Sequence, residues 1–332
     1  MKPQTVQNVA SVSKLVTATM IAQLAERNAL QLNDSVEKFT DFRVRNPAFP
    51  DDEITVLQLL THTSSIRDIR AERRAAYSCG PRRSELSDFM REYFQKTRVD
   101  GVPFTEDPPG TSYRYSNFGY ALAGVIAESV SGESFEELCR AQVFAPLEME
   151  RSSWSFTDSG PNERATHYMW VDDEADLKEI GSSGLEPFLD PPHSVTVQEI
   201  RTQIPFCNYS DEVAPASLLW TSAADFARFL PLFLGTGRPT VLGIEMIQQM
   251  LSAHKTLQTR SGPFTQGLAW VREPRADDRT IWTSSGDAPG VSTVVQIEPE
   301  SGNGIVLFAN SESVHVGLRA MATRFFAGEL LP

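Results

Sequence analysis

The stretch Asn8-Val9-Ala10-Ser11-Val12-Ser13-Lys14-Leu15-Val16 decides how the chain is interpreted. A serine and a lysine stand three residues apart in it, where a long apolar run begins. On a helix, positions i and i+3 share one face with Cβ atoms roughly 5–6 Å apart, so the Lys14 amine can reach the Ser11 hydroxyl. This spacing suits a nucleophile beside its base.

The residues that follow Ser11 predict a buried helix. Apolar side chains occupy nearly every side of the run from Val12 to Leu24, as in a helix enclosed by a domain. Burial and the positive helix N-terminus both disfavour the charged form of Lys14, and a neutral amine can act as a base. Because Ser252-Ala-His-Lys255 repeats the short pattern by chance, spacing alone leaves a purely structural interpretation open.

Length and charge bound the class of protein. The 332 residues can bury a large core, and no apolar run approaches the length of a membrane span. A net charge of −13 argues against sequence-independent nucleic-acid binding, which needs a basic surface. No signal peptide precedes Lys2 and the first residues are polar, so we expect a cytoplasmic protein.

The cysteines favour free thiols. Cys79, Cys139 and Cys207 are odd in number, widely scattered and not in metal-ligand spacing. We therefore expect neither a disulfide nor a zinc site, and we expect the thiols to be buried.

A second helix is predicted by the Thr55-x-x-Gln58 capping box, with an apolar segment that runs to about His62. A histidine at a helix end is more often a structural hydrogen-bonding residue than a catalyst. Six arginines then gather between Ile66 and Arg83 in an otherwise acidic chain. They could bind an anionic ligand, although a solvated face is the more common role of such a segment.

A turn leads into a further buried helix between residues 108 and 132. Tyr115 and Asn117 stand just ahead of that helix, where a phenol and an amide can project into a cleft. Residues 158–192, which include the acidic run Asp172-Asp173-Glu174, are predicted to be a long irregular stretch of the kind that often borders a site.

The C-terminal part has β-strand character. We expect a mainly helical region over residues 11–263, followed over 264–332 by antiparallel strands and a closing helix, within a single domain of residues 1–332. The predicted strands and helix are Gly267–Val271, Thr280–Thr283, Val291–Ile297, Gly304–Ala309 and the helix Val314–Phe326.

Together these features resemble the serine β-lactamase-like superfamily, which includes class C β-lactamases, DD-peptidases and family VIII esterases. The resemblance covers nearly the whole chain. It implies an α+β fold of the β-lactamase/transpeptidase type, in which helices flank an antiparallel sheet and the active site lies between the sheet and a mainly helical region. The matching segments are Ala10–Lys14, Leu59–Ser64, Pro109–Thr111, Tyr115–Asn117, Pro146–Met149, Thr221–Asp225, Gly267–Trp270 and Ser285–Gly290.

The resemblance also implies roles for individual residues. Ser11 would attack an acyl carbon, Lys14 would help to remove its proton, and Tyr115 would carry the proton to the leaving group. Asn117 would hydrogen-bond the substrate, and backbone N–H groups of Ser11 and Asp287 would hold the oxyanion. Turnover through an acyl-enzyme would need neither a metal nor an organic cofactor.

The chain departs from these relatives in the third motif. Where they carry Lys-Thr-Gly or His-x-Gly, this chain has Ser284-Ser285-Gly286, followed by Asp287. A serine offers the substrate a hydrogen bond without a charge. We therefore expect these four residues to border a neutral ester or amide rather than an anionic β-lactam or peptide, unless the arginines of residues 67–83 compensate.

A second departure lies at the front of the chain. Relatives carry about two strands and a helix before the Ser-x-x-Lys motif, whereas only ten residues precede Ser11 here. We therefore expect the sheet to lack N-terminal strands and to expose an edge.

The sequence thus predicts a serine hydrolase, of the esterase type, that acts on a small ester or amide. Three alternatives stay open: a β-lactamase or DD-peptidase, an acyltransferase that uses an alcohol, and a non-catalytic binding protein that retains the fold. The oligomeric state is left undecided.

Overall fold

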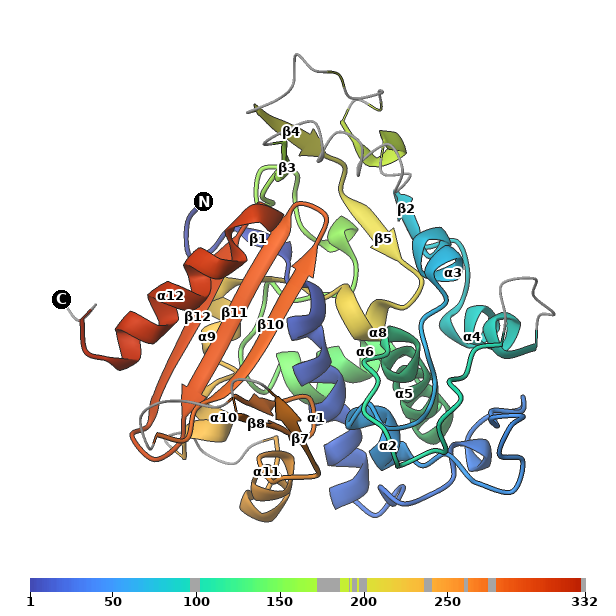
Figure 1. Cartoon of the computed structure of the whole chain (residues 1–332). Coiled ribbons are helices and arrows are strands. Elements are labelled where there is room, and N and C mark those ends of the chain that lie inside the picture. The colour runs from blue at the N-terminus through green and yellow to red at the C-terminus, as the bar shows by residue number, and fades with distance from the viewer. Residues whose placement is uncertain are drawn as a thin grey trace.

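Helix α1 (Ser13–Glu26) lies between an antiparallel sheet and a group of helices (Figure 1). Its side chains are buried from Ser13 to Leu24, as the apolar run predicts. Asn28, just beyond the helix, has a φ of 57°, a left-handed conformation that asparagine tolerates. The computed structural model describes residues 1–95, 102–171, 186–190, 192, 196, 202–235, 241–259, 262–273 and 279–329.

The main sheet has six antiparallel strands in the order β12-β11-β10-β9-β8-β7. Strand β9 pairs with β8 on one side and, on the other, with Trp282 and Thr283 of β10. Among the described residues, the remainder of β10 therefore has a strand partner only on its β11 side. The strands are β7 (Lys255–Thr259), β8 (Gly262–Gln266), β9 (Val271–Arg272), β10 (Trp282–Ala288), β11 (Val291–Glu298) and β12 (Asn303–Ala309).

Helices cover both faces of this sheet, which explains why β11 is buried along its whole length. Val294 packs with Leu318 of α12 (His315–Phe326), whereas the next residue, Val295, belongs to the main core on the opposite face. That opposite face meets α9 (Ala223–Ala227) and α10 (Pro231–Leu234). The predicted closing helix is confirmed.

On the other side of α1 lies the helical region (Figure 1). Its best-buried member is α5, and the Thr55–Gln58 capping box in front of α2 is present as predicted. No helix among the described residues has the length and apolar character that a bilayer span requires. These helices are α2 (Val56–Leu60), α3 (Arg70–Ala75), α4 (Leu86–Gln95), α5 (Asn117–Ser131), α6 (Phe135–Cys139) and α8 (Ala214–Ser217). Helix α11 (Ile244–Met250) lies instead on the sheet side, near β8 and α10 (Figure 1).

Three short two-stranded sheets join distant parts of the chain. They pair β1 (Val6–Asn8) with β6 (Trp220–Ser222), β2 (Tyr77–Cys79) with β5 (Tyr209–Asp211), and β3 (His167–Val171) with β4 (Thr202–Phe206). Strand β12 forms an edge of the main sheet, and no described strand pairs with its outer side.

Two expectations about local structure are wrong. Residues 267–270 form a turn, in which the Gly267 amide donates to the Trp270 carbonyl and Ala269 has a φ of 62°, so the strand ends earlier at Gln266. The stretch 158–192 contains strand β3, because its alternating buried side chains find a partner in β4. The acidic run 172–174 lies outside the described residues.

The expectation of three free thiols is also wrong. Cys79, at the end of β2, and Cys207, just before β5, form a disulfide with their Cα atoms 5.9 Å apart and a sequence separation of 128. Cys139 is free and buried, as expected. Sequence spacing could not show this pair, because folding alone brings these strands together.

Removal of the disulfide should lower stability. The Cys79→Ser/Cys207→Ser variant is expected to lose about 2–4 kcal/mol of folding free energy, since the bridge closes a long loop of the unfolded chain. Thiol titration of the denatured, unreduced protein should find Cys139 alone, and titration after reduction should find all three cysteines. Detection of all three thiols in protein purified without reductant would contradict the pairing.

Candidate active site

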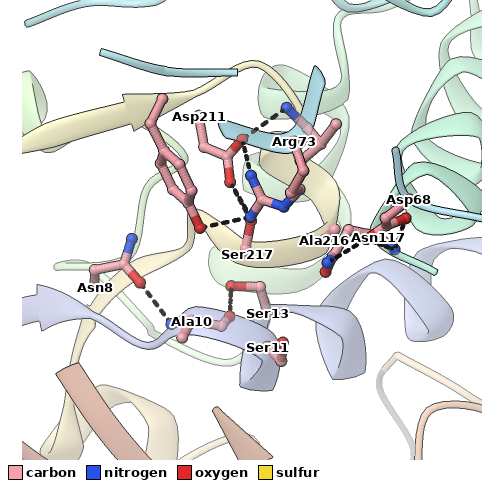
Figure 2. A network of polar contacts seen from close by, with 12 residues as sticks. Asn8, Ala10, Ser11, Ser13, Asp68, Arg73, Asn117, Asp211, Ala216 and Ser217 are labelled. Atoms are coloured by element: carbon pink, nitrogen blue, oxygen red, sulfur yellow. Dashed lines mark hydrogen bonds and ion pairs between the residues drawn. The ribbon is translucent and has the colours of Figure 1, made fainter. Parts of the chain in front are cut away.

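Ser11 lies in a 3₁₀ turn, η1 (Ala10–Val12), which joins strand β1 to helix α1. Ala10 has a φ of 47°, a left-handed conformation that costs a non-glycine residue on the order of 1–3 kcal/mol. The Asn8 side chain accepts from the Ala10 amide at 2.5 Å, and the Ser13 hydroxyl donates to the Ala10 carbonyl (Figure 2). These bonds hold the tight turn that presents Ser11.

Lys14 is 3% exposed, and its amine is surrounded by three oxygens. Its Nζ lies 3.1 Å from Ser11 Oγ, 2.8 Å from Asn117 Oδ1 and 2.7 Å from the Ala216 carbonyl. Burial lowers the pKa of Lys14 to about 7, and the charge of Asp68 partly opposes this effect. A large fraction of the amine is therefore neutral near pH 7.

The three contacts also orient the neutral amine. It has two hydrogens, which Asn117 Oδ1 and the Ala216 carbonyl can accept, because neither oxygen can donate. The lone pair is then left to face Ser11 Oγ. The spacing predicted from the sequence is therefore realised in a geometry that can deprotonate a hydroxyl.

Tyr115 also contacts Ser11. Its hydroxyl donates to Ser11 Oγ at 2.6 Å. The protein around the phenol raises the pKa of Tyr115, so the hydroxyl stays protonated at neutral pH. Lys14 and Tyr115 thus have pKa values displaced in opposite directions, an arrangement typical of a base paired with an acid.

His62 supports Tyr115. The two rings are 4.3 Å apart between centroids, and His62 Nδ1 accepts from the amide of Ser116, the N-cap of α5, at 3.1 Å. Burial lowers the pKa of His62 well below its usual value, so the ring is neutral. These contacts agree with the structural role expected for His62.

Asp68 is a site residue that the sequence interpretation missed. Its carboxylate accepts from Asn117 Nδ2 at 2.7 Å, from the Asn117 amide at 2.9 Å and from the Ser116 hydroxyl at 3.0 Å. Asp68 therefore caps α5 and fixes the amide whose oxygen holds Lys14. The only sign in the sequence is an acid between Arg67 and Arg70.

The third motif lies beside Ser11. A Cβ atom at Gly286 would stand 2.7 Å from the Ser11 nitrogen and 2.6 Å from the Val9 carbonyl oxygen, so only glycine allows β10 to pass this close. Asp287 accepts from Ser292 Oγ at 2.9 Å, and its carboxylate lies 3.2 Å from His315 Nδ1.

A cavity of about 190 Å³ opens over Ser11. Ser284 and Ser285 line it, whereas Asn117, Gly286 and Asp287 lie outside its lining. The full lining is Ser11, Lys14, His62, Tyr113, Tyr115, Phe264, Gln266, Ala269, Val271, Glu273, Thr283, Ser284 and Ser285. Among the described residues, Lys14 is thus the only lysine or arginine of the lining, and Glu273 is its only carboxylate.

A larger cavity of about 680 Å³ lies elsewhere, next to Arg140, Glu148 and Arg151. Its lining contains serines but neither a lysine nor a histidine that could serve as a base. We therefore place the candidate active site in the smaller cavity. Within the described ranges, no three histidine, cysteine or carboxylate side chains gather as a metal site would need.

The described residues of the arginine-rich segment do not line the cavity at Ser11. Arg73 pairs with buried Asp211 and Arg83 with buried Glu212. Three other arginines, Arg67, Arg70 and Arg74, border a separate surface pocket that shares no residue with the cavity at Ser11. The described arginines therefore do not replace the cation missing at Ser284.

Comparisons with known proteins agree with this architecture. A protein-family model described as Beta-lactamase matches residues 1–326. Protein flp of Staphylococcus aureus (strain MW2) is 25% identical over 320 residues, which cover 95% of this chain and 54% of that protein. The chain therefore spans about half the length of the curated relatives it matches.

Solved structures share the fold. The octameric penicillin-binding protein homologue from Pyrococcus abyssi superposes with a TM-score of 0.75 at 22% identity, over 99% of this chain and 67% of that one. EstCE1, described as a hydrolase with promiscuous acyltransferase activity, gives a TM-score of 0.70 at 16% identity, over 95% and 82%. The predicted superfamily and α+β fold class are confirmed. Since the family model covers nearly the whole chain, the protein belongs to the beta-lactamase family.

Proposed function

We propose that the protein is a serine hydrolase of the esterase type, which transfers the acyl group of a small neutral ester or amide to Ser11 and then to water. One observation carries this proposal. Ser11 Oγ lies within reach of both a buried amine, 3.1 Å away at Lys14, and a protonated phenol, 2.6 Å away at Tyr115. A nucleophile, a base and an acid are thus assembled in one cavity.

In the proposed acylation step, Ser11 Oγ attacks the acyl carbon while its proton passes to Lys14. Tyr115 gives its own proton to the leaving group as the bond to the acyl carbon breaks, and it recovers a proton from Lys14. Backbone N–H groups of Ser11 and Asp287 would hold the oxyanion; the loss of one such donor typically costs about 10²–10³ in rate. Water then attacks the acyl-enzyme and releases Ser11.

The charges around the cavity favour a neutral substrate. Ser284 supplies a hydroxyl where relatives carry a cation, and Glu273 places a carboxylate in the lining, although Arg319 of α12 pairs with it. Asp287 adds a second carboxylate on the adjoining strand, with half of its side chain exposed. Of the lining residues that the structure describes, only Lys14 could offer a substrate carboxylate a positive charge.

The disulfide bears on where the protein works. Structural disulfides persist in oxidising compartments and are rare in the cytosol. The Cys79–Cys207 bridge therefore favours an exported or otherwise oxidising location in place of the cytoplasmic one expected from the sequence.

A fluorophosphonate probe should label the protein at Ser11. Labelling should be lost in Ser11→Ala and retained in Ser252→Ala, the matched control from the chance Ser-x-x-Lys pattern. Absence of labelling in the unmodified protein, together with no turnover of esters, would favour the non-catalytic binding protein. Rapid nitrocefin hydrolysis or stable acylation by penicillin would instead favour the β-lactamase or DD-peptidase alternative.

The acylation rate should depend on pH through Lys14. As the pH falls below about 7, the amine gains a proton and loses the lone pair that faces Ser11, so the rate should fall about tenfold per pH unit. The measurement is kcat/KM for a neutral p-nitrophenyl ester between pH 5 and 9. If kcat/KM instead fell with an apparent pKa near 4–5, as for a carboxylate base, or near 10.5, as for an exposed lysine, the assignment of Lys14 as the base would be contradicted.

Substitution of Ser284 should change the preferred substrate charge. In Ser284→Lys, the ratio of kcat/KM for a carboxylate-bearing ester over its neutral analogue should rise about 10–100-fold, the value of one charge-assisted hydrogen bond. Ser284→Met, which has similar length without charge, is the control. An equal change in both variants would show that side-chain size, rather than charge, governs selection.

A further inference from the structure

The Ala216 carbonyl, which accepts from Lys14, belongs to the four-residue helix α8 and needs support of its own. On one side that support comes from α1, where the Thr17 hydroxyl donates to the Pro215 carbonyl at 2.6 Å. On the α5 side, a Cβ at Gly124 would lie 2.4 Å from Pro215 Cγ, so α5 and α8 are in very close contact. A helix this short has little stability alone, and its neighbours must fix it.

The remaining support comes from a buried ion pair. Asp211, with no exposed side-chain surface, accepts two bonds from the Arg73 guanidinium, at 3.0 and 2.8 Å. Ser217, the residue after Ala216, donates its hydroxyl to Asp211 and accepts from Arg73 at 3.2 Å (Figure 2). The C-terminal end of α8 is therefore held between the two charges.

Arg73 is itself held firmly. Its guanidinium donates to the Tyr77 hydroxyl at 2.6 Å and stacks on the Tyr77 ring, 4.3 Å from the centroid. The Val213 amide, at the start of α8, also donates to Asp211, at 3.1 Å. Both ends of the short helix thus bond to the same carboxylate.

A buried ion pair alone is weak evidence for function, because many such pairs are only structural. Here both members of the pair bond to Ser217, the residue after Ala216, whose carbonyl accepts from Lys14. The two charges also act in opposite directions on the pKa of Lys14, which Asp211 raises and Arg73 lowers. The other described groups that face Lys14 are the rings of Tyr115 and Tyr120, the neutral ring of His62 and the Asp68 carboxylate. Of the described charged groups that act on Lys14, Arg73 is the only one with a permanent positive charge.

We propose that the Arg73–Asp211 ion pair positions Lys14, holding the Ala216 carbonyl through Ser217 and balancing the charge that the amine experiences. Arg73, Asp211 and Ser217 are positioning residues, since none of them lines the cavity at Ser11. This inference rests on the proposed function, in which Lys14 is the base.

The charge effect can be measured without turnover. Protein labelled with ¹³C-lysine gives a Cε resonance for Lys14, assigned with a Lys14→Met variant, whose titration reports the pKa. Arg73→Gln leaves Asp211 negative and should raise this pKa by about 0.5–1 unit, whereas Asp211→Asn leaves Arg73 positive and should lower it by a similar amount. The acid limb of the pH–rate profile should move in the same two directions.

Arg83→Gln is the matched control. Arg83 pairs with Glu212, the neighbour of Asp211, but its side chain is 55% exposed and no bond connects it to α8. This variant should leave the Lys14 titration unchanged. Shifts in the same direction for Arg73→Gln and Asp211→Asn, or no shift in folded protein, would overturn the proposal.

Ser217→Ala tests whether Ser217 helps to hold the Ala216 carbonyl against Lys14. This variant also keeps the proposal testable if Arg73→Gln and Asp211→Asn fail to fold. This substitution keeps the ion pair and removes only the hydroxyl beside Ala216. It should lower kcat about 3–10-fold with KM unchanged, the loss of roughly one hydrogen bond. A lowered Tm with unchanged kcat would show a purely structural role. If the labelled Lys14 titrates as expected but Ser11 never reacts, the proposed function fails and the positioning role stands.

Discussion

The arrangement of the segments around the site depends on the burial of one amine, that of Lys14. A lysine ammonium in an apolar interior is costly, and it stays there only if its charge is reduced and its hydrogens find acceptors. The fold meets both conditions, since burial lowers the pKa of Lys14 to about 7 and three oxygens surround Nζ. Those oxygens come from η1, α5 and α8, so three separate segments must converge on one atom.

This convergence explains features that otherwise look unrelated. Helix α5 must begin where the side-chain amide of its first residue, Asn117, can reach Lys14 of α1. Asp68 fixes this start by accepting from three consecutive residues. Helix α8 must approach both α1 and α5, and Gly124 permits this because any side chain there would collide with Pro215. On the sheet side, Gly286 lets β10 touch the backbone at Ser11 for the same steric reason. Close backbone approach is thus the common requirement of the site.

Sequence reasoning succeeded where a signal is local. The Ser11–Lys14 spacing, the Thr55–Gln58 cap and the apolar closing helix each depend on residues within a few turns. It failed where the partner is distant: Arg73 and Asp211 are separated by 138 residues, and the two disulfide cysteines by 128. Such pairs leave no periodicity in the sequence, and only the three-dimensional fold shows them.

The arginine-rich segment shows how a distant pairing changes the chemistry that is inferred. As a sequence it suggests a basic surface that could compensate for the cation missing at Ser284. In the fold, Arg73 and Arg83 instead neutralise two buried acids on consecutive residues, Asp211 and Glu212, just ahead of α8. Because both guanidinium groups pair with these buried acids, neither is free to bind a substrate carboxylate. Among the described residues, the cavity at Ser11 therefore has no lysine or arginine besides Lys14, which is consistent with the neutral substrate proposed above.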